Sequence, residues 1–293
     1  MARGLSRALP AAQLSVIVNV GDDDVIYGVQ VSADVDTVTY TLAGIEGPQG
    51  WGIAGDTFTV VDQLARVGVD TTFRLGDRDL AICMYRTQEL ARGRSLTAVT
   101  KAIADHFEIG PAVLPASDEA IRTRVRTEAG EWLSFQEYFV DRRHRDTIVA
   151  VEYDRADRAA PAHAALDAIE QSDLVIIAPS NPPLSIWPML AMPALRAAIQ
   201  TKPRVVAVSP LFGGKALKGP AEHVLAGLGL PAGTGGILAA YDELLTDLVI
   251  DQSDAADLER FRGSSVSLHA ADTRIAQPRA AERFAGWLLE TMR

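Results

Sequence analysis

Aspartates gather near the start of the chain. Asp22, Asp23, Asp24, Asp34 and Asp36 are five acids within fifteen positions. Oxygen-rich groups of this kind suit Mg²⁺, which usually takes one or two carboxylates together with substrate phosphates. The alternative is a solvated turn followed by a helix that an aspartate caps. Asp36 is the most informative of the five, because it lies where a helix is expected to start after a strand.

A glycine pair followed by a lysine is a second candidate. In Gly213-Gly214-Lys215, backbone N–H groups could approach an anion while the lysine adds a positive charge. The spacing is not that of a Walker A loop. The same residues would also suit an ordinary turn between a strand and a helix.

Two further segments present polar side chains on constrained backbone. Ser180 and Asn181 precede Pro182-Pro183, which restrict the chain after an apolar run. The segment 74–79 places Arg74 and Arg78 beside Asp77 and a glycine, so an arginine could bind a carboxylate or phosphate. A rigid turn and mutual surface pairing are the respective alternatives.

Other chemistries are disfavoured. No pair of the five histidines has a HExxH-type spacing, no GxSxG elbow occurs, and the single cysteine, Cys83, suits a helix core. The net charge of −10 disfavours general nucleic-acid binding. There is neither an apolar run of about 20 residues nor a secretory signal, which predicts a cytoplasmic protein without a membrane span.

The elements that must position these residues follow from hydrophobic patterning. Apolar strands are predicted over 14–20, 173–178, 204–208 and 245–250, and helices over 1–9, 36–44, 56–67, 77–91, 95–107, 184–200, 220–227 and 279–292. Alternation of fully apolar strands with helices predicts an α/β fold, with a Rossmann-like, mostly parallel sheet covered by helices on both faces. Ligands bind beyond the carboxyl ends of such strands.

The middle of the chain has a different pattern. Residues 122–140 alternate and turn at Ala129-Gly130, and 147–153 is another strand candidate. We therefore expect a single domain over 1–293, with a small antiparallel β-hairpin insertion at about 111–153.

Taken together, many segments resemble the 2-phospho-L-lactate transferase family of coenzyme F-420 biosynthesis, including its bacterial phosphoenolpyruvate-type members. The matching segments run in order along nearly the whole chain: 18–23, 32–38, 51–53, 56–58, 75–79, 135–137, 178–182, 208–210, 213–221 and 269–273. So many ordered segments make the resemblance more specific than any one motif.

The resemblance implies a Mg²⁺-dependent transfer. A phospholactyl or phosphoenolpyruvyl group would pass from a guanosine diphosphate-linked donor to the ribityl 5′-hydroxyl of the deazaflavin FO, releasing GMP. Asp36 would be catalytic, Asp36 and Arg74 would contact FO, and Asp22, Asp23 and Asp34 would be metal or positioning residues. The remaining substrate-binding candidates are Asn19, Thr37, Gly76, Asp77, Arg78, Ser180, Asn181, Ser209, Gly213, Gly214 and Lys215. A homodimer is also expected.

The start of the chain departs from the family pattern. Members usually begin with a strand and a GGxGGA(K/R) loop, whereas Met1-Ala2-Arg3-Gly4-Leu5 resembles the residues after that loop. A misassigned start codon or a shortened chain would explain the difference. The competing functions are a relative that binds nucleotide or deazaflavin without turnover, and a different nucleotide-dependent phosphotransferase of related fold.

Overall fold

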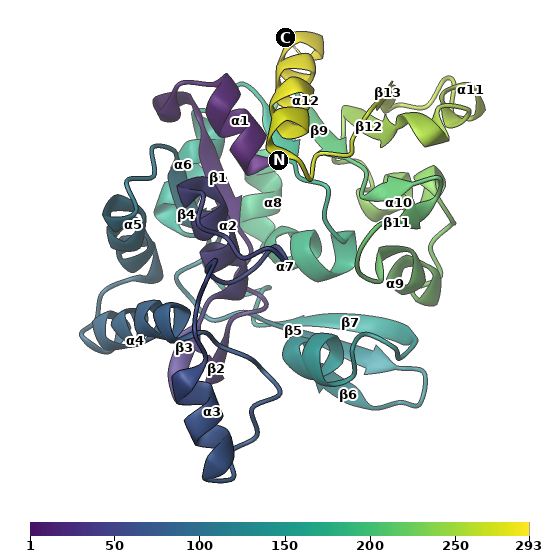
Figure 1. The fold of residues 1–293 in the computed structure, drawn as a ribbon. Helices are drawn as coiled ribbons and strands as arrows, with labels where there is room; N and C mark the ends of the chain where they lie inside the picture. Colours follow the sequence, from purple (N-terminus) through teal and green to yellow (C-terminus); the bar gives the residue numbers. More distant parts are fainter. Residues whose placement is uncertain (293) are drawn as a thin grey trace.

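The computed structural model describes residues 1–292, and its parallel strands form two groups (Figure 1). The larger group is a four-stranded sheet in the order β13-β12-β9-β8, in which every neighbouring pair is parallel. Its strands are β8 (Val175–Ile177), β9 (Val205–Val208), β12 (Asp247–Asp251) and β13 (Ser267–Ala271). The smaller group pairs β1 (Ser15–Val18) with β4 (Ala112–Pro115), also in parallel.

Burial explains why these segments form strands. Every residue of β9 and β12 is buried, and the side chains of β9 are three valines and an alanine. β-Branched residues favour extended backbone, and strands covered on both faces have continuous apolar sequences. The predicted α/β class with mostly parallel strands is therefore confirmed.

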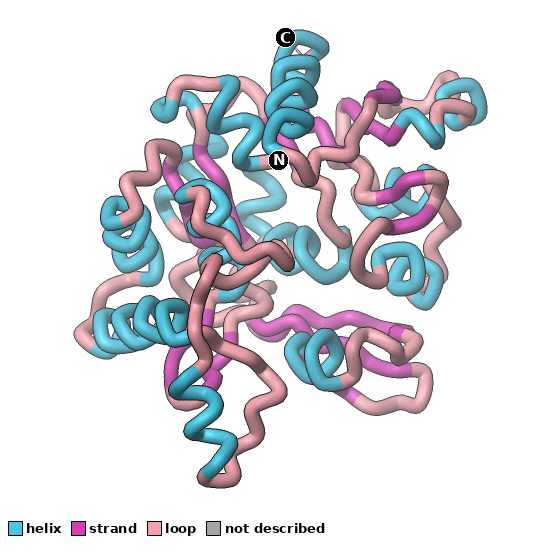
Figure 2. The backbone as a smooth tube through the Cα atoms, in the orientation of Figure 1, coloured by secondary structure: helices cyan, strands magenta, loops and turns pink. Residues whose placement is uncertain are grey.

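Helices surround the strands, as the cyan segments of Figure 2 show. The α-helices are α1 (Ala2–Ala8), α2 (Ala33–Ala43), α3 (Thr59–Arg66), α4 (Asp77–Ala91), α5 (Leu96–His106), α6 (His163–Glu170), α7 (Trp187–Leu190), α8 (Pro193–Gln200), α9 (Ala221–Gly227), α10 (Thr234–Ala240), α11 (Asp257–Arg260) and α12 (Pro278–Thr291). Short helical turns occupy Ala11–Gln13, Glu137–Asp141, Pro182–Ile186 and Gln252–Asp254. The first and last helices, α1 and α12, pack against each other.

An antiparallel sheet lies at the opposite end of the molecule from α1 and α12 (Figure 1). Its strands β5 (Arg122–Thr127), β6 (Trp132–Ser134) and β7 (Ile148–Asp154) have the order β6-β5-β7. The alternation expected up to Val140 ends earlier, because Glu137–Asp141 forms a π-helical turn. Two small antiparallel pairs join β2 (Asp24–Ile26) to β3 (Val29–Val31) and β10 (Leu211–Phe212) to β11 (Lys215–Ala216).

Three predicted helices differ from the observed ones by more than one residue at an end. The one expected over 184–200 is divided into a π-helical turn, α7 and α8. Pro188 and Pro193 account for the division, because proline donates no N–H and disfavours helix in the residue before it. The helix expected from Asp56 begins at Thr59, because the Asp56 carboxylate instead accepts from the amides of Arg78 and Asp79.

The helix that carries Asp36 also starts earlier than predicted. Ser32 is the N-cap of α2, and the Asp36 amide donates to the Ser32 carbonyl at 2.9 Å. Asp36 is therefore inside the first turn and is not the cap. Among residues 1–292, no helix combines the length and the apolar character needed to cross a bilayer.

Candidate active site

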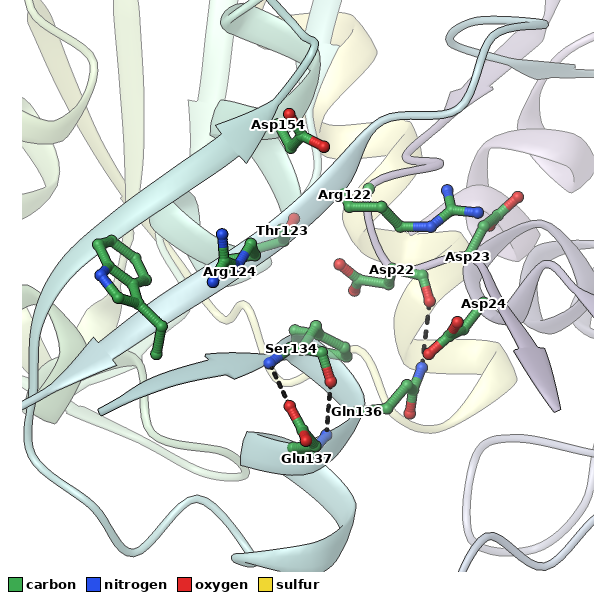
Figure 3. Close-up of a pocket in the computed structure, with 13 residues that line it drawn as sticks. Asp22, Asp23, Asp24, Arg122, Thr123, Arg124, Ser134, Gln136, Glu137 and Asp154 are labelled. Atoms are coloured by element: carbon green, nitrogen blue, oxygen red, sulfur yellow. Dashed lines mark hydrogen bonds between the residues drawn. The ribbon is translucent and has the colours of Figure 1, made fainter.

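A pocket of about 350 Å³ opens between the loop that follows β1 and the antiparallel sheet (Figure 3). The loop contributes Gly21, Asp22, Asp23 and Asp24, and the remaining lining comes from Arg122, Thr123, Arg124, Trp132, Ser134, Phe135, Gln136, Glu137 and Asp154. We call residues 21–24 the acidic loop. Carboxylates and guanidinium groups therefore face each other across one cavity.

Two carboxylates of the acidic loop, those of Asp22 and Asp23, each have one oxygen without a hydrogen-bond partner. Asp22 and Asp23 are each 4% exposed, and Oδ1 of each is buried without a hydrogen-bond partner. Burial, reinforced by the charge of Asp34, raises the pKa of Asp22 well above its usual range. Burial also raises the pKa of Asp23 to about 7, although the Ser32 hydroxyl donates to its other oxygen. Positive charge supplied at this loop would favour both ionised forms.

Asn19 organises the acidic loop. Its side-chain amide donates to Asp34 Oδ2 at 3.0 Å, and its Oδ1 accepts from the Gly21 amide at 2.8 Å. Gly21 leaves no room for a side chain, because a Cβ there would lie 2.7 Å from Thr123 Oγ1 and 2.8 Å from Pro188 Cβ. The structure thus brings four predicted site residues together: Asn19, Asp22, Asp23 and Asp34.

Asp36 lies beside this group in a second, fully enclosed network. Its carboxylate Oδ1 accepts from the guanidinium of Arg86, while Oδ2 is buried without a partner. Asp36 is 5% exposed and Arg86 is 0% exposed. Burial raises the pKa of Asp36, and the positive charge of Arg86 opposes that rise. Asp36 does not line the pocket itself, but Ser32 connects it to Asp23 through the two hydrogen bonds described above.

Arg86 occupies the position that a cation would take in this network. Ligand atoms of Asp36, Asp79 and Cys83 lie within 4.8 Å of one another, close enough to share a metal ion. The Arg86 guanidinium, however, already contacts Asp36 and lies 3.7 Å from Cys83 Sγ. The fixed positive charge supplies the neutralisation, so the metal candidates remain those of the acidic loop.

The predicted residues of segment 74–78 lie at the junction of α3 and α4, where their polar groups already have partners. Asp77 accepts from the Thr57 hydroxyl at 2.6 Å and from the amides of Thr59 and Val60 at 3.0 Å each, which lowers its pKa to about 2. Arg74 pairs with Asp62 at 2.8 Å on the surface.

The glycine of this segment and the exposed Arg78 also belong to the junction. At Gly76, a Cβ would lie 2.2 Å from the Asp56 carboxylate, which explains the glycine. The Arg78 side chain donates to the Ala54 carbonyl at 3.3 Å.

The glycine–lysine segment forms the turn between β10 and β11. The Gly213 amide donates to Asp254 Oδ2 at 2.9 Å, and Gly214 also hydrogen-bonds that carboxylate. A carboxylate of the protein therefore stands where the sequence suggested a phosphate. Lys215 is exposed, whereas Ser209 is buried and its hydroxyl accepts from the Leu211 amide at 3.1 Å.

The segment after β8 holds the other predicted residues near the strand end. The Ser180 amide donates to the Ala178 carbonyl at 2.8 Å, which fixes a tight turn. The side-chain oxygen and nitrogen of Asn181 are both buried without partners. Thr37 is a partly buried residue of α2, next to Asp36.

Sequence reasoning missed two contributions to the site. In β5, Thr123, Val125 and Thr127 are buried, so Arg122 and Arg124 alternate onto the face that lines the pocket. That alternation was a usable signal. The sequence around Arg86 gives no such signal, because an arginine in an amphipathic helix is normally exposed to solvent.

Comparison with known proteins identifies the family. Residues 1–282 match the model of the family described as 2-phospho-L-lactate transferase CofD. A phosphoenolpyruvate transferase of Streptomyces griseus is 37% identical, over 98% of this chain and 93% of the relative. A 2-phospho-L-lactate transferase of Methanosarcina acetivorans is 33% identical, over 98% of this chain and 93% of the relative.

A solved structure supports the fold. A member of the UPF0052 family from Bacillus halodurans superposes with a TM-score of 0.64 at 16% identity, covering 98% of this chain and 94% of that one. The family match spans nearly all of the described chain, and the sequence relatives span both their own length and this one. This chain belongs to the 2-phospho-L-lactate transferase family.

Proposed function

We propose that this protein transfers a phosphorylated three-carbon acid, 2-phospholactyl or phosphoenolpyruvyl, to the ribityl 5′-hydroxyl of the deazaflavin FO in coenzyme F-420 biosynthesis. The donor is the guanosine diphosphate-linked acid, and GMP leaves. The family and its transferase relatives support the reaction class. The observation that carries the proposal to this site is a buried acidic loop with unpartnered carboxylate oxygens, facing arginines across a pocket.

The chemistry needs positioning more than covalent catalysis. The hydroxyl oxygen of FO bonds to the phosphorus that carries the acid, and the bond from that phosphorus to the GMP oxygen breaks. Asp36 is the residue assigned to take the hydroxyl proton, because its Oδ2 is buried without a hydrogen-bond partner; Asp36 does not line the pocket and is joined to it through Ser32 and Asp23. Arg122 and Arg124 provide positive charge on the facing wall of the pocket.

The acidic loop fits Mg²⁺. Asp22 Oδ1 and Asp23 Oδ1 are buried carboxylate oxygens without partners, and Asp34 adds a third carboxylate close to Asp22. Hard oxygen ligands of this type suit Mg²⁺, which would neutralise the phosphate oxygens of the donor. Asn19 keeps Asp34 and the Gly21 backbone in place around that position.

The donor would bind on the side of β8 and β9. The unpartnered amide of Asn181 can accept from and donate to a nucleotide. Ser209 directly follows β9, and Ser180 lies three residues beyond the end of β8. Lys215 is exposed and available for a phosphate, although the amides of Gly213 and Gly214 would first have to leave Asp254. Arg74 would reach FO only by exchanging its contact with Asp62.

One experiment tests the activity. The purified chain is incubated with FO, Mg²⁺ and each donor in turn, GMP release is followed, and the product mass identifies the acid transferred. Release of GMP that depends on FO supports the proposal. Quenching of deazaflavin fluorescence without GMP release would instead indicate a relative that binds and does not turn over. The expected homodimer stays a prediction, which light scattering of the same sample tests.

A further inference from the structure

Arg86 is the most enclosed charged side chain in the neighbourhood of the site. It extends from α4, has no exposed surface, and donates to Asp36 on α2 and to the Gln30 carbonyl in β3 at 3.2 Å. It therefore connects three elements that lie behind the acidic loop. Its Nε is also buried without a partner.

Stabilisation of the fold alone is a weak explanation for a buried arginine. Removing a guanidinium from water costs several kcal/mol, and well-packed apolar residues often stabilise a core as well as a buried ion pair does. Here the enclosed arginine also leaves one nitrogen unsatisfied, which adds to the cost. Stability therefore does not explain why an arginine is buried here, whereas a role in holding a reactive carboxylate does.

We propose that Arg86 is a positioning residue for Asp36, a role that rests on the proposed function. The guanidinium holds Oδ1 of the carboxylate, so that Oδ2 is the oxygen left to accept the proton of the attacking hydroxyl. Because the guanidinium is planar and its donors are fixed in direction, it sets the orientation of the carboxylate as well as its charge. Arg86 touches neither substrate and acts through Asp36.

The arrangement predicts a specific kinetic signature. Arg86→Met removes the fork while keeping an unbranched side chain, so Asp36 can rotate within its enclosure. We expect kcat to fall by about 100-fold, the scale at which a misplaced reacting group slows a reaction. The KM values for FO and donor should stay within about threefold, because binding contacts are kept. Arg86→Lys keeps the charge without the fork and should recover part of kcat.

A double-mutant cycle separates positioning from structure. In an Asp36→Asn background, Arg86→Met should lower the melting temperature but should not lower kcat further, since the residue it positions is already lost. Arg94→Met is the matched control, because Arg94 pairs with Glu89 at 2.8 Å at the far end of α4 and should leave kcat unchanged.

Three results would overturn the role. They are an equal fall in kcat in both backgrounds, an Arg86→Met enzyme with normal kcat, or a change in KM alone. If Arg86→Met does not fold, Arg86→Lys carries the same comparison, and normal kcat there with no dependence on Asp36 would reject the proposal. A wild-type chain that binds FO but releases no GMP would reject the proposed function itself, and with it this role.

Discussion

The acidic loop and the turn that begins α4 are both rich in aspartate, yet their carboxylates have opposite surroundings. At the turn, Asp77 is partly exposed and accepts three hydrogen bonds from the chain, and its pKa is lowered to about 2. In the loop, Asp22 and Asp23 are buried, each has an oxygen without a partner, and their pKa values are raised.

The difference distinguishes carboxylates that serve the fold from those available to a ligand. A folded chain normally satisfies its buried polar groups, so those left unsatisfied need a separate explanation. By this criterion the acidic loop and Asn181 remain candidates for binding a ligand, whereas Asp77 and the Gly213 amide already have protein partners.

The largest effect should come from Asp36. We expect Asp36→Asn to lose at least about 100-fold in kcat, the scale of general base catalysis. The protein should still fold, because the amide oxygen can accept from Arg86, but its melting temperature should fall, because the buried guanidinium loses its negative partner. Asp105→Asn, an exposed carboxylate paired with Lys101 on α5, is the control. GMP release close to wild type by a folded Asp36→Asn protein would remove Asp36 from the mechanism.

The second effect concerns Mg²⁺ at the acidic loop. Saturating Mg²⁺ at a hundred times its dissociation constant should stabilise the wild type by about 2.7 kcal/mol, a rise of roughly 5 °C in melting temperature. In Asp23→Asn the rise should be largely lost, and turnover should fall with it. Asp105→Asn should keep the full rise, and an equal rise in Asp23→Asn would place the ion elsewhere.

A smaller effect separates the two candidates for binding the donor phosphate, which are the Lys215 side chain and the Gly213 amide. Loss of one charge-assisted hydrogen bond in Lys215→Ala should raise the donor KM by about tenfold and leave the FO KM unchanged. Asp254→Ala frees the amide of Gly213, so it should leave the donor KM unchanged or lower it. A raised FO KM with an unchanged donor KM in Lys215→Ala would contradict this prediction and would place the lysine at the FO site.

The smallest effect is expected at Asp77, whose carboxylate stabilises the fold. Asp77→Ala should lower the melting temperature by about 3 °C, because three hydrogen bonds at the start of α3 are lost. The folded pKa of about 2 lies below the ordinary value, so this stabilisation is present above pH 4 and is lost as pH falls toward 2. Thermal scans of both proteins from pH 7 to pH 3 measure this. A difference that grows on acidification would contradict it, and so would a large change in the FO KM.

The sequence predicted the parts of the fold that local pattern controls. The strands around Val205–Val208 and Asp247–Asp251 and the long helix Asp77–Ala91 follow from apolar runs and helical periodicity. The boundaries it missed depend on distant contacts. Asp56 is recruited to α4 and so cannot begin α3, and Ser32 starts α2 four residues before Asp36.

Part of the candidate site could also be predicted, because some of its residues are close together in the sequence. Asn19, Asp22, Asp23 and Asp34 are close in sequence, so their gathering needs only one strand and one helix start. Arg86 and Arg122 reach the site from 50 and 86 positions beyond Asp36, which local pattern cannot indicate. That the Gly213 amide binds Asp254 likewise required the folded chain, since the two are 41 positions apart.

The tight packing around Gly21 has a consequence for redesign. The base of the antiparallel sheet meets the acidic loop through the Thr123 amide, which donates to the Gly21 carbonyl at 2.8 Å, and through Gln136, which donates to the Asp22 carbonyl at 3.1 Å. The tip of the same hairpin, residues 128–131, is exposed. A reporter peptide or an affinity tag inserted at Gly130 would thus enter an exposed turn that makes neither of these contacts, whereas exchanging the hairpin from its base would remove both hydrogen bonds that hold the acidic loop.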